Sequence, residues 1–237
     1  MRVLFALYGT ILAAIDTRAR RYGFVALGAL GVLVAWSVSR SFFLIDPVAD
    51  ATTLLDVFNL TFLAPVAALV FGTAALGDPT DDNTLVYLWL RPVARWKLAL
   101  AGIAAAVTFV LPYSVIPATI EAAIVADGPV VRAAALSSAA AAVAYSAVFV
   151  LLGLVSRRSL VWGIGYLLIF ESFIARGGKS LGALSIHAHA ASILARTADV
   201  KLRLGYFTPR TALVSLGVVT VVALAITTRR LGRADVP

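Results

Sequence analysis

Six long apolar runs constrain this chain more than any other feature of its sequence. They cover about residues 22–43, 53–76, 98–125, 133–155, 159–175 and 209–228. A helix needs about 20 apolar residues to cross the hydrocarbon core of a bilayer. Lipid offers the backbone no hydrogen-bonding partner, and the runs lack the strict alternation of barrel strands. Each run therefore predicts a membrane-spanning helix.

The composition excludes a water-soluble domain of this length. Hydrophobic residues make up 61% of the 237 residues and charged residues only 14%, whereas a soluble domain carries about 25% charged residues. The sequence contains no low-complexity linker and no stretch typical of a separate soluble domain. We therefore expect an all-α integral membrane protein with residues 1–237 in a single transmembrane domain.

The N-terminal segment, residues 2–20, predicts a helix that lies at the membrane interface. Its apolar part, Val3 to Ile15, is too short to span a bilayer. A signal peptide is disfavoured because no small-x-small cleavage site precedes Asp16. The apolar side chains that share one face of this helix are Leu4, Tyr8, Ile11 and Ile15.

The basic residues indicate an orientation rather than a nucleic-acid ligand. The net charge is +8, but the Lys and Arg residues cluster at the ends of the apolar runs, where they face anionic lipid. With the N-terminus inside, the two short outer turns hold only Arg40 and Arg132. In this orientation 12 of the 20 Lys and Arg residues fall on inner segments: Arg2, Arg18, Arg20, Arg21, Arg91, Arg95, Lys97, Arg157, Arg158, Arg229, Arg230 and Arg233. We expect both termini on the cytoplasmic side of the plasma membrane.

A polar segment, residues 77–97, joins the second and third runs. Gly77 and Pro79 are expected to end the second span. Asp82 or Asn83 can cap a short helix over Thr84 to Leu90. On its own this pattern also fits an ordinary charged inner loop with aromatic anchors at the interface.

The same segment resembles the signature of the type-2 ABC transporter permeases. The matching positions are Thr84-Leu85, Leu88, Arg91-Pro92 and Arg95. The family usually has Gly-Glu where this chain has Gly77-Asp78, and Glu-Gly or Lys-Gly where it has Asp82-Asn83. An interfacial N-terminal helix, six spans, a re-entrant outer segment between spans five and six, and a basic tail follow the family order.

This resemblance implies the permease subunit of an ABC exporter, which moves a small molecule, peptide or lipid-like substrate outward. The segment would act as a cytoplasmic coupling helix seated in a groove on a separate ATPase subunit. Two such ATPases would carry the ATP and magnesium, beside a second permease copy or paralogue that faces spans one and five. This chain would be no enzyme and would hold no cofactor or metal. The expected coupling residues are Asp78, Asp81, Asp82, Thr84, Leu85, Leu88, Trp89, Arg91 and Arg95.

One apparent nucleotide motif does not fit a phosphate-binding loop. Gly178-Lys179-Ser180 resembles the end of a P-loop, but the first glycine of that motif would fall at Phe173. The motif also follows a predicted span on its outer side. We therefore expect ATP to bind to the partner subunit and not to this chain.

Acids near the outer ends of spans give candidates for a gate or vestibule. They are Asp56, Glu121 and Glu171. Charges at membrane depth are costly and are often functional. Interfacial ion pairing and snorkelling is the simpler interpretation and the one we favour. Glu171 is the best exception, because Phe170-Glu171 resembles a recurring position of the permease family, which implies a role in gating.

The outer segment 176–210 contains an apolar stretch, 183–195, that predicts a short helix dipping into the outer leaflet. His187 and His189 lie on it about 200° apart around a helix, so they are not expected to share a metal ion. We expect both histidines to be polar surface residues.

Two other function classes stay open at this point. An ion-coupled secondary transporter would need broken mid-membrane helices with central charges, and the acids here lie off-centre. An integral-membrane lipid-modifying enzyme would need clustered histidines or carboxylates, and the chain has two histidines and scattered acids.

Overall fold

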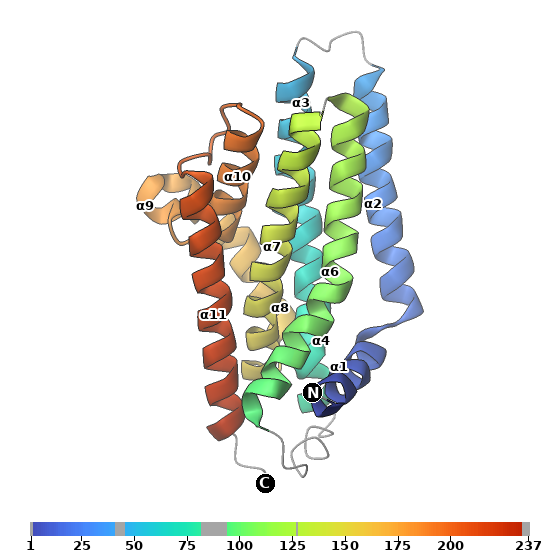
Figure 1. Cartoon of the computed structure of the whole chain (residues 1–237), viewed down its shortest axis with the longest axis vertical. Coiled ribbons are helices and arrows are strands. Elements are labelled where there is room, and N and C mark those ends of the chain that lie inside the picture. The colour runs from blue at the N-terminus through green and yellow to red at the C-terminus, as the bar shows by residue number, and fades with distance from the viewer. Residues whose placement is uncertain (1, 41–45, 82–93, 127, 234–237) are drawn as a thin grey trace.

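The computed structural model describes residues 2–40, 46–81, 94–126 and 128–233, and these residues form a helical bundle without strands (Figure 1). Six of the helices are long and apolar enough to cross a membrane. This confirms the predicted all-α, multi-pass architecture.

Each apolar run of the sequence corresponds to one span of the bundle. Span one is α2 (Arg18–Ser39) and span three is α6 (Arg95–Val125). Span four is α7 (Gly128–Val155) and span six is α11 (Pro209–Arg233). The observed ends extend several residues beyond most of the runs, because charged and small residues continue the helices past the apolar core.

Spans two and five are each interrupted by a wider π-helical segment. Span two consists of α3 (Pro47–Leu54), η1 (Leu55–Leu63) and α4 (Ala64–Asp81). Span five consists of α8 (Ser159–Gly165), η2 (Tyr166–Glu171) and the short 3₁₀ turn η3 (Ile174–Gly177). π-helical segments are rare and often mark functional positions. Both segments carry acids that the sequence singled out, Asp56 in η1 and Glu171 in η2.

The N-terminal helix is shorter than expected and is separate from span one. It is α1 (Arg2–Ile15), and Asp16 and Thr17 break the chain before α2 begins. The Thr17 side chain caps α2 by accepting a hydrogen bond from the backbone N–H of Arg20. The single helix predicted over residues 2–20 is therefore wrong in its second part, because this cap starts a new helix at Arg18.

α1 packs on the bundle against α6 and α4. Its buried face consists of Leu7, Ile11 and Ile15, with Leu4 and Tyr8 half-buried beside them. The Tyr8 hydroxyl lies 2.9 Å from Thr108 Oγ1 of α6. The predicted apolar face is thus nearly right, but it packs against other helices of the bundle, α6 and α4.

Small residues bring α4 and α7 into close contact at the centre of the bundle. A Cβ atom added at Gly153 of α7 would lie 2.8 Å from Thr73 Cα, and one at Gly77 of α4 would lie 3.3 Å from Gly153 Cα. Gly77 therefore does not end span two, as the sequence suggested; it lets the helix continue past α7 as far as Asp81. Close backbone approach at small residues is how membrane helices gain packing energy.

The bundle has two distinct ends, which we name the α1 end and the α3 end (Figure 1). The last turn of α4, the first turn of α6 and the last turn of α11 lie at the α1 end, together with the N-terminus. α3, the end of α6 and the start of α7 lie at the α3 end. The two described residues that flank 82–93, Asp81 and Ala94, both belong to the α1 end.

We expect Gly153→Ala to destabilise the bundle, because its methyl group would overlap the backbone of Thr73. Overpacking of this kind costs about 1–3 kcal/mol. Gly217→Ala in α11 is the matched control, since nothing lies within 4 Å of a Cβ at that position. Thermal unfolding in detergent measures both variants, and equal midpoints for the two would contradict the assigned α4–α7 contact.

Candidate functional site

A short buried helix between spans five and six organises the polar groups of the bundle. α10 (Ile186–Thr197) packs against α7, α11 and η1. Every residue from Ile186 to Ala195 is buried. The sequence was right to predict a helix over 183–195, but this helix is enclosed by other helices and does not face lipid.

Glu171 at the end of η2 caps the N-terminus of α10. Its Oε1 accepts hydrogen bonds from the Tyr166 hydroxyl at 2.6 Å and the Ile186 backbone N–H at 3.0 Å. Its Oε2 accepts from Ser185 Oγ at 2.5 Å and the His187 N–H at 3.3 Å. A carboxylate in this position satisfies backbone donors that have no partner within the helix, and it complements the positive end of the helix dipole.

Ser185 completes the cap. Its Oγ accepts a hydrogen bond from the Ala188 N–H at 2.9 Å while it donates to Glu171. Further along α10, Ser192 Oγ accepts from the Phe207 N–H at 3.2 Å, which ties the irregular chain after α10 to the helix. Irregular backbone at membrane depth is tolerated when it is satisfied by protein in this way.

His187 connects α10 to span two. Its Nε2 lies 2.8 Å from Asp56 Oδ1 and 3.3 Å from Thr61 Oγ1, both of which belong to η1. Asp56 and Thr61 are five residues apart, and both reach His187 because η1 is wound as a π-helix. The Thr61 hydroxyl also donates to the Asp56 carbonyl oxygen at 2.8 Å. His187 thus connects the two acids. Its ring bonds Asp56, and its backbone N–H donates to Glu171.

The expectation that both histidines are surface residues is wrong. His187 is 1% exposed and His189 is 4% exposed. His189 bonds the Ala183 carbonyl oxygen through Nε2 at 3.1 Å, and its ring packs 4.6 Å from that of Phe207. Burial lowers the pKa of His189, although the bond to Ala183 and the nearby Glu171 act in the opposite direction. His189 therefore has a structural partner for its polar atom in Ala183 and for its ring in Phe207.

Glu121 of α6 stands apart from this network. It is 1% exposed and lies between α6, α2 and η1, where a Cβ atom at Gly31 would overlap Glu121 Oε1 and the Phe58 ring. Neither carboxylate oxygen has a hydrogen-bond partner among the residues that the structure describes. A neighbouring polar group, Asn59, is by contrast satisfied: it donates to the Ser114 carbonyl oxygen and accepts from Ser138.

The pairing of these acids differs from one to the next. Across the described ranges, no Lys or Arg forms a salt bridge with Asp56, Glu121 or Glu171, whereas Asp56 Oδ1 lies 2.8 Å from the ring of His187. The interpretation favoured from the sequence, interfacial pairing and snorkelling, stays a prediction. Asp56 has a histidine partner and Glu171 has a helix N-terminus, and neither partner is recognisable from spacing along the chain.

Only the flanks of the predicted coupling segment belong to the described structure. Asp78 forms an ion pair with Arg20 of α2 at 3.2 Å and is half-exposed. Asp81 ends α4 and Arg95 begins α6. The other predicted coupling residues lie outside the described residues: Asp82, Thr84, Leu85, Leu88, Trp89 and Arg91.

Comparison of the chain with protein-family models and with curated proteins finds no match in either set. The class of this protein therefore rests on its fold alone. It is a membrane-embedded bundle of six spans with a buried, carboxylate-capped helix between the last two.

We expect Glu171→Gln to loosen the first turn of α10. The amide replaces one acceptor oxygen with a donor, so two of the four donors that point at Glu171 lose their partner, at about 1–3 kcal/mol each. Hydrogen exchange at the amides of residues 186–188 should accelerate. Glu121→Gln is the matched control, since that side chain has no hydrogen bond to lose within the described chain. Unchanged α10 exchange in Glu171→Gln would contradict the capping role.

Proposed function

We propose that this chain is the permease subunit of an ABC exporter, driven by a separate ATPase that grips the polar segment 77–97. The observation that carries the proposal is the position of the flanks of this segment. α4 and α6 reach it at the α1 end, and α1 packs on the same two helices. A force applied there acts on both spans and on the N-terminal helix at once.

The packing of the central helices supports a lever role for span two. α4 is held tightly against α7 by the contacts of Gly77 and Thr73 with Gly153. α1 is fixed to α6 by buried apolar side chains and by the contact of Tyr8 with Thr108. Displacement of the segment would therefore move α4 with α7 and α6 with α1, instead of bending single helices.

The exposed faces of the outer spans support assembly with a second permease. α2 leaves Leu33 and Trp36 exposed, and span five leaves Trp162 and Ile169 exposed. These spans are the ones that the family resemblance assigns to the contact between permeases. The path for a substrate that is a small molecule, a peptide or a lipid would then run between the two copies, outward from the α1 end.

The buried polar groups support a transport role over an enzymatic one. Glu171 accepts hydrogen bonds from backbone N–H groups of α10, and Asp56 bonds the ring of His187, so both acids have partners within the bundle. One observation favours a different mechanism: Glu121 is buried without a described partner. Such a carboxylate suits proton or cation coupling in a secondary transporter, which is the second candidate function.

We expect Asp81→Lys/Asp82→Lys to uncouple ATP hydrolysis from transport while the spans stay folded. In this proposal the acids of the segment meet basic residues on the ATPase, so charge reversal would replace attraction with repulsion. The measurements are the amount of ATPase subunit that co-purifies with the chain, the ATPase activity of the complex and its thermal stability.

The control for this experiment is Asp50→Lys/Asp199→Lys, which reverses an acid of α3 and an acid directly after α10, both away from the polar segment (Figure 1). It should leave the amount of bound ATPase and its activity unchanged. Equal ATPase binding and activity in both double variants would contradict the proposal. So would gradient-driven transport by the chain alone that is lost in Glu121→Gln, which is the result that the second candidate predicts.

A further inference from the structure

A groove with three arginines lies at the α1 end, between the start of α2, the last turns of α4 and the start of α8. Its volume is about 500 Å³, within the range of about 300–1,000 Å³ that is typical of ligand sites. The charged residues that line it are Arg20, Asp78, Arg157 and Arg158. None of the interactions described above uses the last two.

The groove carries an excess of positive charge. Asp78 pairs with Arg20 at 3.2 Å and offsets its charge. Arg157 and Arg158 are exposed, and no carboxylate pairs with either of them in the portion of the chain that the structure describes. Three guanidinium groups against one carboxylate leave two positive charges. Adjacent guanidinium groups match the geometry of phosphate oxygens and bind them through paired N–H donors.

One wall of the groove is apolar and continues along span five. Val70 and Ala74 of α4 line it from one side, and Leu160 and Val161 of α8 from the other. Above Val161 on the same face of the helix, Ile164 and Leu168 are also exposed. A free phosphate ion would contact only the arginines, whereas a phospholipid would contact the arginines with its headgroup and this face with an acyl chain.

We propose that this groove binds an anionic phospholipid, with Arg157 and Arg158 holding its phosphate and the exposed face of α8 receiving an acyl chain. The cytoplasmic leaflet, which the distribution of Lys and Arg assigns to the α1 end, is the leaflet rich in anionic lipid. Basic pockets between spans on that side are suited to such headgroups. The site depends on this orientation and not on ATPase coupling, so either proposal can fail without the other.

The test uses the purified full-length chain in a neutral detergent. Native mass spectrometry counts bound lipid during titration with phosphatidylglycerol, with phosphatidylcholine as the zwitterionic comparison. We expect phosphatidylglycerol to bind more tightly, and Arg157→Gln/Arg158→Gln to weaken its binding about tenfold or more, since two charged hydrogen-bonding groups are lost. Thermal unfolding without lipid checks that this variant is folded.

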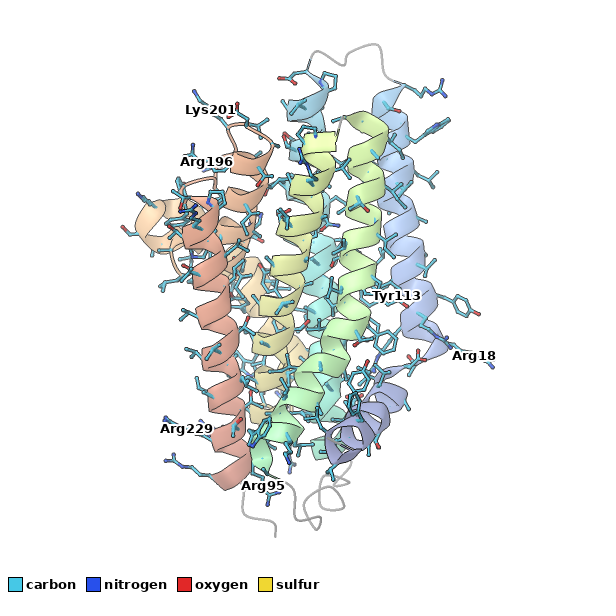
Figure 2. All side chains as sticks on the ribbon, in the orientation of Figure 1. Arg18, Arg95, Tyr113, Arg196, Lys201 and Arg229 are labelled. Atoms are coloured by element: carbon cyan, nitrogen blue, oxygen red, sulfur yellow. The ribbon has the colours of Figure 1, made fainter. Side chains whose placement is uncertain are left out.

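The matched control is Arg229→Gln/Arg230→Gln, which removes two adjacent exposed arginines from α11 at the same end of the bundle (Figure 2). It changes the net charge equally and should leave lipid binding unchanged. A second variant, Arg157→Lys/Arg158→Lys, keeps the charge but loses the planar donors, and should bind with intermediate affinity.

Three results would overturn the proposal. Equal weakening in the α11 control and the groove variant would assign lipid binding to general surface charge. Unchanged phosphatidylglycerol binding in Arg157→Gln/Arg158→Gln would exclude the groove. Displacement of the bound lipid by inorganic phosphate at low millimolar concentration would identify the ligand as a free phosphate and not a lipid.

Discussion

The bundle depends on one constraint: a polar group at membrane depth must find its partner within the protein, because lipid supplies none. α10 shows how this constraint is met. Its first backbone donors are accepted by Glu171, Ser185 caps it, and His187 bonds Asp56 across to span two. Both of these carboxylates come from π-helical segments, where the wider winding lets side chains reach partners that a regular helix would leave out of range.

The same constraint separates the molecule into two functional ends. The hydrogen-bonded network around α10 joins spans two and five, and span six packs on the same helix. At the α1 end, the buried contacts are made mainly by apolar and small side chains, such as Ile11 and Gly153, and most of the basic residues there are exposed. Because the α1 end carries exposed arginines, it is suited to contact partners and lipid. At the α3 end, the hydrogen-bonded network holds the helices in fixed positions.

Much of the fold follows from the sequence, because apolar length alone determines where spans lie. The six runs and the short helix over 183–195 were predictable in this way. The π-helical segments were not, since the widening at Asp56 and Thr61 has no signature in residue type. The bonds of Glu171 to Ser185 and of His187 to Asp56 were not predictable, because 14 and 131 residues separate the partners in the chain. Gly77 was misjudged as a helix end, because its contact with Gly153 is tertiary.

The central claim is that the segment joining α4 and α6 faces the cytoplasm, where an ATPase can reach it. The chain contains no cysteine, so single substitutions report their side of the membrane directly. In intact cells, a membrane-impermeant maleimide should label Arg132→Cys, at the exposed start of α7, and should label Asn83→Cys only after permeabilisation. Labelling of Asn83→Cys in intact cells, with Arg132→Cys protected, would contradict the account.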